Sequence, residues 1–284
     1  MNVLITGSKG FIGHHLTSVF LKKYNLFAPS HRQLDLLDDH AVLKYIKGHA
    51  IDVIIHCAVT DGNKPEAFGQ NLRMFFNIVR CKQYYTRLIH IGSGAEYDKR
   101  YPIIHVREDD IETHIPVDKY GLYKYICAKY IACSDDMVDL RVFGIFGEGE
   151  DYHRRFISNA MCRTMYGLPI TINQNVFFDY LDVLDFVKIV DYFIRHKPKY
   201  TAYNVGCGKK MDLVSIAKEI QTLSGNTDDT IIIGKQLLAN EYTCNINRLL
   251  REYSEFKPTP ITRSLQRLFL WYTKHKSRMN KKEL

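Results

Sequence analysis

The chain opens with a short apolar strand, a glycine-rich loop and an amphipathic helix, and this order constrains its fold more than any other segment. Glycines spaced three residues apart after a strand allow a tight turn, the close approach of a pyrophosphate and close packing of the next helix. The N-terminus of that helix offers free N–H groups and a positive dipole end to phosphates. We therefore predict a dinucleotide-binding loop. Its residues are Gly7, Ser8, Lys9, Gly10, Phe11, Ile12 and Gly13.

Apolar strand patterns and helical patterns alternate along the first half of the chain. Such alternation is typical of βαβ units, in which helices cover both faces of a parallel sheet. With the glycine loop after the first strand, it predicts an α/β fold built on a Rossmann-type, doubly wound parallel sheet. The predicted strands are 2–5, 26–29, 52–56, 87–91 and 138–142, and the predicted helices are 11–24, 40–48, 71–85 and 119–133.

The alternation loosens after about residue 150, where we expect a smaller lobe that covers the substrate. We assign residues 1–150 to the dinucleotide-binding domain and predict that residues 178–207 cross back to its sheet. Residues 151–177 and 208–284 then form the substrate-binding lobe. Substrate specificity would be set in this lobe, where side-chain directions cannot be read from residue spacing.

Tyr120 and Lys124 lie four residues apart in a predicted helix and therefore share one of its faces. An ammonium beside a phenol favours the phenolate. A tyrosine in that setting can give a proton to a carbonyl oxygen, or take one from an alcohol, near neutral pH. Ser93 follows a predicted strand, at the sheet edge where ligands bind in folds of this kind, so its hydroxyl can bond the same substrate oxygen. We predict that Ser93, Tyr120 and Lys124 are the catalytic residues.

The end of the second predicted strand indicates which dinucleotide is bound. NAD sites usually carry an acid there for the adenosine ribose, whereas this chain has Ser30, His31 and Arg32. These side chains could hold a 2′-phosphate, which a carboxylate would repel. We therefore expect NADP(H) rather than NAD(H). Asp35 is the nearest acid and keeps NAD(H) as the alternative. Asp35 and the adjacent Leu36 are further candidate contacts of the cofactor.

Composition argues against several other classes of protein. The formal net charge of +8 suits a polyanionic ligand, but the chain lacks the sequence patterns of nucleic-acid-binding modules. No apolar run reaches the roughly 18 residues needed to cross a bilayer, and no secretory leader is recognisable. The seven cysteines are scattered without metal-ligand spacing, as in reduced cytosolic proteins. We expect a cytoplasmic protein that binds no metal, membrane or nucleic acid.

These features together resemble the extended short-chain dehydrogenase/reductases of the nucleotide-sugar epimerase/dehydratase type, over nearly the whole chain. The matching segments are the glycine loop, His56-Cys57-Ala58-Val59, Gly92-Ser93-Gly94-Ala95-Glu96-Tyr97, Leu140-Arg141-Val142-Phe143-Gly144-Ile145-Phe146-Gly147 and Asp179-Tyr180-Leu181-Asp182-Val183-Leu184-Asp185. The resemblance implies a nucleoside-diphosphate sugar as substrate, and a homodimer formed through helices 71–85 and 119–133. It also implies cofactor contacts by Cys57, Ala58, Val59, Phe143 and Ile145, and substrate contacts by Ser93, Gly94 and Ala95.

Departures from the family pattern narrow the expected reaction. The 4,6-dehydratases have Asp and Glu where this chain has Gly94 and Ala95, and GDP-fucose synthases have a cysteine where it has Ala95. Gly144 replaces a frequent asparagine. Phe178 replaces the arginine that often reaches the substrate pyrophosphate, so another cation is needed there. The candidate cations are Arg154 and Arg155 first, and also Arg163, Lys209, Lys210 and Arg248.

The residues that remain support hydride and proton transfer at one carbonyl. We therefore predict an NADPH-dependent reductase of the 4-keto group of a nucleotide-linked 4-keto-6-deoxyhexose. One alternative is a nucleotide-sugar 4-epimerase with tightly bound NAD, which needs only the same three catalytic residues. Another is a redox-sensing or scaffolding module that binds a dinucleotide without turnover. The identity of the nucleotide and of the sugar stays open at this point.

Overall fold

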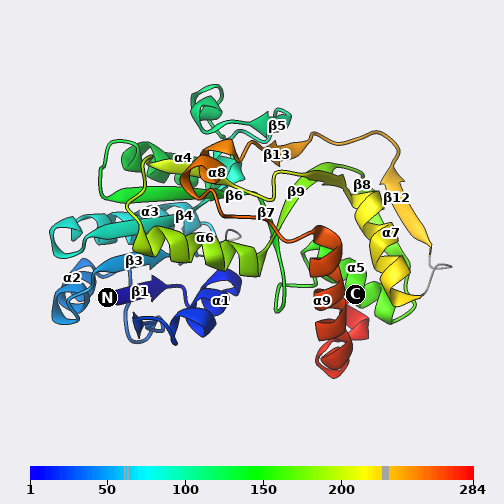
Figure 1. Ribbon diagram of the computed structural model, residues 1–284, viewed down its shortest axis with the longest axis horizontal. Coiled ribbons are helices and arrows are strands. Elements are labelled where there is room, and N and C mark those ends of the chain that lie inside the picture. The colour runs from blue at the N-terminus through cyan, green and yellow to red at the C-terminus, as the bar shows by residue number, and fades with distance from the viewer. Residues whose placement is uncertain (61, 63, 226–229) are drawn as a thin grey trace.

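The computed structural model describes residues 1–60, 62, 64–225 and 230–284. Its larger part is a six-stranded parallel sheet with the order β10-β6-β4-β3-β1-β2 (Figure 1). These strands are β1 (Asn2–Thr6), β2 (Asn25–Phe27), β3 (Val53–His56), β4 (Arg87–Ser93), β6 (Met137–Val142) and β10 (Ala202–Val205). The α/β fold with a Rossmann-type sheet, as predicted from the alternating pattern, is confirmed.

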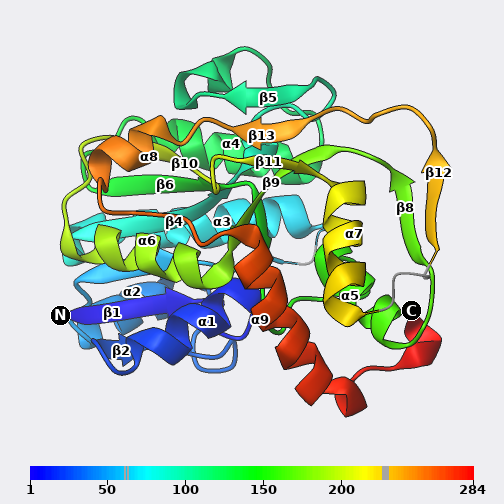
Figure 2. The ribbon, with the colours of Figure 1, turned by 45° about the vertical axis from the view of Figure 1, so that its right-hand side comes forward.

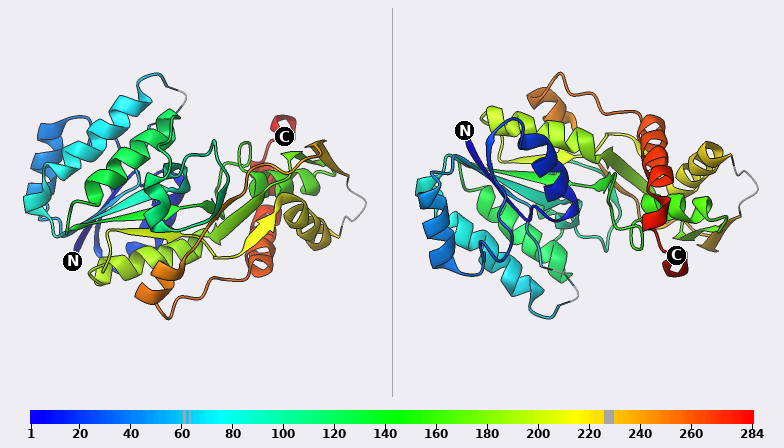
Figure 3. Two further views of the ribbon diagram at one scale, coloured as in Figure 1. Left: turned by 90° about the horizontal axis from the view of Figure 1, so that it is seen from above. Right: turned by 90° about the horizontal axis from the view of Figure 1, so that it is seen from below.

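Helices cover both faces of this sheet, as the views along its edge show (Figure 3). One face packs against α1 (Phe11–Phe20), α6 (Val183–Arg195) and α8 (Asn247–Glu252). The opposite face packs against α2 (Asp39–Gly48), α3 (Ala67–Val79) and α4 (Lys119–Ile131). Because both faces are covered, the central strands are buried throughout, which explains their nearly continuous apolar runs.

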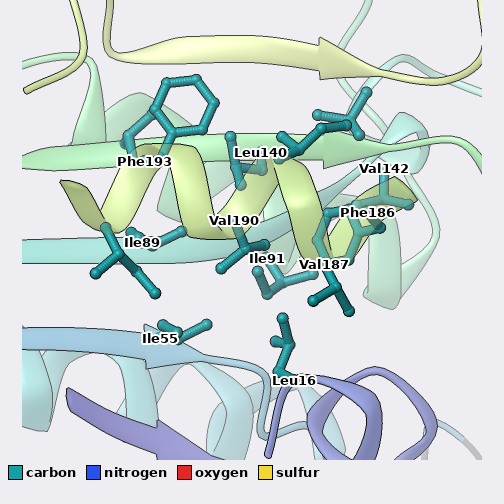
Figure 4. Packing of buried hydrophobic residues seen from close by; sticks show 14 of the residues in the cluster. Leu16, Ile55, Ile89, Ile91, Leu140, Val142, Phe186, Val187, Val190 and Phe193 are labelled. Atoms are coloured by element: carbon teal, nitrogen blue, oxygen red, sulfur yellow. The ribbon is translucent and has the colours of Figure 1, made fainter. Parts of the chain in front are cut away.

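The core between the sheet and helices α1 and α6 is built from interleaved aliphatic and aromatic side chains (Figure 4). Burying a side chain of this size contributes about 1.5–3 kcal/mol relative to leaving it exposed. The sheet supplies one layer and the helices the other. The labelled members are Ile55, Ile89, Ile91, Leu140 and Val142 from the strands, and Leu16, Phe186, Val187, Val190 and Phe193 from the helices.

The third helix differs from its prediction. The apolar pattern predicted a helix at 71–85, whereas α3 spans Ala67–Val79 and is followed by a short 3-10 turn, η1 (Lys82–Tyr84). Cys81 and Tyr85 are also buried, and they continued the apolar pattern beyond the end of the helix. The apolar pattern thus follows buried residues as far as Tyr85, although the helix itself ends at Val79.

The second lobe has a core of its own. Helices α5 (Phe156–Met165), α7 (Leu213–Ser224) and α9 (Ile261–Lys274) surround an apolar cluster separate from those of the large sheet. Beside them lies a two-stranded pair of β8 (Ile170–Gln174) and β12 (Ile231–Lys235). No helix in the described part of the chain is long and apolar enough to cross a bilayer.

A mixed sheet joins the two lobes. It has the order β11-β9-β13-β5, with β7 paired to β9. It therefore brings β5, from the first half of the chain, against β13, from the C-terminal part (Figure 2). The strands are β5 (Ile103–Val106), β7 (Gly144–Phe146), β9 (Phe177–Asp182), β11 (Lys210–Asp212) and β13 (Tyr242–Cys244).

Candidate active site

The glycine loop forms a compact turn between β1 and α1. Gly7 has a φ of +68°, and a Cβ there would lie 2.7 Å from the backbone of Ala58. A Cβ on Gly13 would lie 2.2 Å from the carbonyl oxygen of Gly7, and Gly10 N–H donates to that oxygen at 3.0 Å. Helix α1 has no side-chain cap at Gly10, so its N-terminus is open to an anion. The geometry fits the phosphates of a dinucleotide.

The other residues of the predicted loop lie around this turn. Phe11 and Ile12 begin α1 and are half-buried, whereas the Lys9 side chain is exposed. The Ser8 hydroxyl donates to the carbonyl oxygen of Ala28 at 3.3 Å and so ties the loop to the end of β2. The adenosine side of the candidate cofactor site is thereby held beside the phosphate loop.

Beyond β2 the chain forms an exposed turn with both signs of charge. His31 and Arg32 are exposed, and the Ser30 hydroxyl donates to Gln33 Oε1 at 2.8 Å. Asp35 lies 3.7 Å from His31 and accepts the backbone N–H of Leu37. Arg32 is therefore available to a phosphate, whereas His31 and Asp35 already lie beside each other. Leu36, in contrast, packs in the core on the α2–α4 side, so its side chain does not face this turn.

The residues after β3 line the next part of the site. Ala58 lies directly under the glycine loop, and its N–H donates to Thr6 Oγ1 at 3.4 Å. Burial raises the pKa of the Cys57 thiol to about 12, which the nearby Lys124 ammonium partly opposes. Cys57 is therefore a neutral thiol at physiological pH. Val59 is 52% exposed and offers an apolar surface at the mouth of the site.

The three predicted catalytic residues converge at the carboxyl end of β4. Ser93 ends that strand, is buried, and its Oγ accepts the N–H of Ala95 at 3.1 Å. Helix α4 begins after Asp118, which accepts the N–H of Gly121. A Cβ on Gly121 would lie 2.6 Å from the Ala95 carbonyl oxygen. Because Gly121 has no side chain, α4 can approach the turn after Ser93, which places Tyr120 near that turn.

Tyr120 and Lys124 differ in their exposure. Tyr120 is 40% exposed, whereas the Lys124 ammonium is buried and donates to the carbonyl oxygen of Ile91. Burial alone would lower the pKa of Lys124, but the neighbouring phenols of Tyr123 and Tyr120 outweigh it and the pKa is raised. Lys124 therefore stays an ammonium at neutral pH and can support a developing phenolate on Tyr120.

A residue missed by the sequence analysis, Tyr242 of β13, reaches this site from the second lobe. Its hydroxyl lies 2.5 Å from the position a Cβ would take on Gly94. Burial raises the pKa of Tyr242, the charge of a Tyr120 phenolate would raise it further, and the nearby Ser93 lowers it. The Tyr242 hydroxyl is thus placed beside both Ser93 and Tyr120.

Tyr242 belongs to a row of aromatic side chains that runs from the turn after Ser93 into the second lobe. Its ring centroid lies 5.0 Å from that of Phe143 and 5.5 Å from that of Phe178. Phe178 lies 5.2 Å from Tyr180. Phe178, which stands where the family often has arginine, is therefore part of an apolar wall. Ile145 is partly buried and packs against the core formed with α1 and α6.

Replacing Tyr242 with phenylalanine is expected to lower kcat about tenfold, because a hydrogen bond from its hydroxyl to a substrate oxygen would be worth roughly 1–1.5 kcal/mol. The ring and its packing remain, so the melting temperature should change little. Steady-state kinetics would measure the effect, with Tyr130→Phe as a control because that side chain lies on the exposed face of α4. An unchanged kcat in Tyr242→Phe would show that the hydroxyl takes no part.

The candidate cations for a pyrophosphate fall into two groups. Arg154, Arg155 and Lys209 have exposed side chains, and Arg155 acts electrostatically on Tyr180 in the aromatic row. The others are already engaged within the protein. They are Arg163, bound to the carbonyl oxygens of Pro169 and Leu284, Lys210, paired with Glu241, and Arg248, paired with Asp109 and Glu108.

The model of the NAD dependent epimerase/dehydratase family matches residues 3–206. The chain belongs to this family. The match covers the glycine loop, the turn after Ser93 and helix α4, and it ends just after β10. Residues beyond 206, which include Tyr242, lie outside the matched region.

Individual relatives are more distant. GDP-L-colitose synthase from Yersinia pseudotuberculosis is 31% identical over 109 residues, which cover 35% of this chain and 35% of that protein. A dTDP-4-dehydro-6-deoxy-D-allose reductase from a Streptomyces species is 22% identical, with 96% of this chain and 97% of that protein covered. Among solved structures, a GDP-L-fucose synthetase from Naegleria fowleri has a TM-score of 0.86 at 14% identity, covering 99% and 95% of the two chains. UDP-glucose 4-epimerase from Thermotoga maritima has a TM-score of 0.83 at 16% identity, covering 97% and 100%. The structural likenesses show the shared fold.

Proposed function

We propose that this member of the family is an NADPH-dependent reductase of a nucleotide-linked 4-keto-6-deoxyhexose. The observation that carries the proposal is the makeup of the catalytic turn. The Tyr242 hydroxyl lies within electrostatic reach of Ser93 and Tyr120, and the Lys124 ammonium interacts with the Tyr120 phenol. Such a set can polarise and protonate one carbonyl oxygen. The Streptomyces relative, a dTDP-4-dehydro-6-deoxy-D-allose reductase, supports the same reaction class.

The acidic side chains nearest to this turn are engaged elsewhere. Glu96 is fully buried, accepts the N–H of Ser93 at 2.8 Å and pairs with Arg141 at 2.8 Å. Asp118 caps helix α4, and Asp98 pairs with Arg100. Gly94 and Ala95 carry no acid at all. A dehydration or a C3/C5 epimerisation needs an acid or base at the sugar ring, so reduction fits these residues better.

In the proposed reduction, each residue of the site has a separate role. The glycine loop would hold the cofactor's pyrophosphate, since Gly7 and Gly13 allow a turn so tight that an added Cβ would collide with the backbone of Ala58 or of Gly7. A bound nicotinamide supplies the hydride for the keto carbon. Ser93 orients the carbonyl through a hydrogen bond, and Tyr120 gives its phenolic proton to the developing alkoxide. Lys124 stabilises the resulting phenolate, and the partly exposed Tyr120 regains its proton from water.

The exposed turn after β2 supports a preference for NADPH. Arg32 is exposed in the turn that follows Ala28, the residue to which Ser8 of the glycine loop donates, so its guanidinium could bind a 2′-phosphate. We expect Arg32→Ser to lower kcat/KM with NADPH about tenfold, since a hydrogen bond to a charged group is worth roughly 1.5–3 kcal/mol. The value with NADH, which lacks the phosphate, serves as the control and should stay the same. Equal losses with both cofactors would contradict the assignment.

The proposal is tested by NADPH consumption at 340 nm with a panel of CDP-, dTDP-, GDP- and UDP-linked 4-keto-6-deoxysugars. Turnover restricted to one nucleotide series would support the reductase and identify its substrate class. The alternative is a 4-epimerase with retained cofactor, which the same three catalytic residues could serve. Purified protein that carries stoichiometric NAD and interconverts nucleotide-hexoses without added cofactor would favour the epimerase.

A further inference from the structure

The buried end of Lys124 makes contacts that the proposed reaction does not by itself require. Its ammonium donates to the carbonyl oxygen of Ile91 and lies 3.4 Å from Nε2 of His90. Both partners belong to β4, the strand that ends in Ser93. Lys124 and His90 are 3% and 1% exposed, so neither contact is shared with bulk water.

The second nitrogen of His90 determines which tautomer faces Lys124. His90 Nδ1 lies 2.8 Å from Oδ1 of Asp139, in a wholly buried pair. An ionised carboxylate can only accept, so Nδ1 carries the hydrogen. Nε2 of a neutral imidazole then presents its lone pair, and the Lys124 ammonium donates to it. The geometry is self-consistent only with this Nδ1–H tautomer.

Asp139 is itself held in place on the side away from His90. Its Oδ2 accepts from Arg141 Nε at 3.1 Å. Burial would raise the pKa of Asp139, but the contacts with His90 and Arg141 lower it by a larger amount, so the carboxylate stays ionised. A Cβ on Gly92 would lie 2.3 Å from Asp139 Oδ1. The glycine therefore makes room for the carboxylate between β4 and β6. This fixed carboxylate orients the imidazole ring.

The charged and titratable groups that face His90 come from three elements: His56 on β3, Asp139 on β6 and Lys124 on α4. Burial lowers the pKa of His90 to about 4, the Lys124 ammonium lowers it too, and Asp139 opposes both. Protonation of Nε2 would also place two cations in contact. His90 therefore remains neutral around pH 7 and remains an acceptor.

We propose that His90, oriented by Asp139, is a positioning residue for the catalytic ammonium of Lys124. An ammonium has three N–H groups. One donates to Ile91 O and one to His90 Nε2, which leaves the third for the neighbouring phenols of Tyr123 and Tyr120. The inference rests on the proposed role of Lys124, but its structural part, the tautomer and the contact, holds for any reaction at this site.

The structural part is tested by long-range ¹H–¹⁵N NMR of protein labelled at histidine nitrogens. His90 is assigned by its through-space contact to Phe75, whose ring centroid lies 5.4 Å away, and by its absence in His90→Gln. We expect a single Nδ1–H tautomer that does not titrate between pH 5.5 and 8. We also expect its Nε2 resonance to shift downfield in Lys124→Met, because the hydrogen bond is lost. An Nε2–H tautomer, or an Nε2 resonance unaffected by Lys124→Met, would overturn the proposal.

The functional part is tested by two substitutions of His90. His90→Phe removes the acceptor and is expected to lower kcat about tenfold, with KM for the substrate unchanged. His90→Gln offers an amide oxygen in place of Nε2 and should retain kcat within about threefold of the parent. A parental kcat in His90→Phe, or equal losses in both variants, would refute the positioning role. The NMR result does not depend on turnover, so it separates a failure of this inference from a failure of the proposed reaction.

Discussion

Tyr120→Phe is expected to lower kcat about a thousandfold, since a positioned general acid contributes roughly 10²–10⁴ to the rate. The substitution removes one oxygen from a half-exposed ring on α4 and leaves the neighbouring ring of Tyr123, 5.4 Å away, without a clash. The fold and the glycine loop are untouched. Loss of rate without loss of stability would therefore report the chemistry.

Three measurements test this prediction. Steady-state kinetics should show the fall in kcat, fluorescence titration should show an unchanged Kd for NADPH, and thermal unfolding should show an unchanged melting temperature. Retention of more than a tenth of the parental kcat would mean that Tyr120 is not the proton donor. In that case Tyr242, whose hydroxyl also lies beside Ser93, would be the next candidate.

Gly13→Ala is expected to abolish cofactor binding, with Kd raised at least a hundredfold. The new methyl group would lie 2.2 Å from the Gly7 carbonyl oxygen and 2.9 Å from Cα of Ser8, both in the loop. The loop cannot yield easily, because Gly7 already has a positive φ and lies against Ala58. The loop would have to open, which displaces the N–H groups that face the phosphates. Overpacking of this kind also costs about 1–3 kcal/mol of stability.

Gly69→Ala is the matched control for this substitution. Gly69 lies in helix α3 and would have nothing within 4 Å of an added Cβ. Alanine favours a helix over glycine by about 1 kcal/mol, so stability should rise slightly and cofactor binding should not change. Titration of both variants with NADPH, beside their thermal unfolding curves, separates loop damage from a general effect of glycine replacement. Normal NADPH affinity in Gly13→Ala would contradict the predicted cofactor loop.

Local patterns made the larger sheet predictable. The apolar strands from Asn2, Val53 and Arg87 onward lie close to their predicted positions, because strands buried on both faces have continuous apolar runs. The glycine loop was recognisable because its spacing reflects short-range sterics, which the structure shows at Gly7 and Gly13. The shifted bounds of α3 show the limit: apolar residues mark burial, and burial continues beyond the end of a helix.

The parts of the candidate site that were missed depend on contacts between distant segments. Tyr242 reaches Ser93 from a three-residue strand about 150 residues further along the chain, and its side-chain direction depends on the pairing of β13 with β9 and β5. His90 looks like one more residue of a buried strand until α4 and β6 place Lys124 and Asp139 on either side of its ring. No local periodicity encodes such encounters. The side chain of Leu36 is part of the core, so any contact of this residue with the cofactor would be made by its backbone, and the predicted contact stays a prediction.

The most direct test of the central claim is the fate of the hydride. The protein would be incubated with NADPH carrying deuterium at both C4 positions and with the sugar nucleotide that supports turnover in the panel, and the product would be analysed by NMR and mass spectrometry. The account predicts one deuterium at C4 of the hexose for each NADPH consumed, and labelling about a thousandfold slower with Tyr120→Phe. Deuterium at another carbon, or interconversion of hexoses without consumption of NADPH and without label, would contradict it.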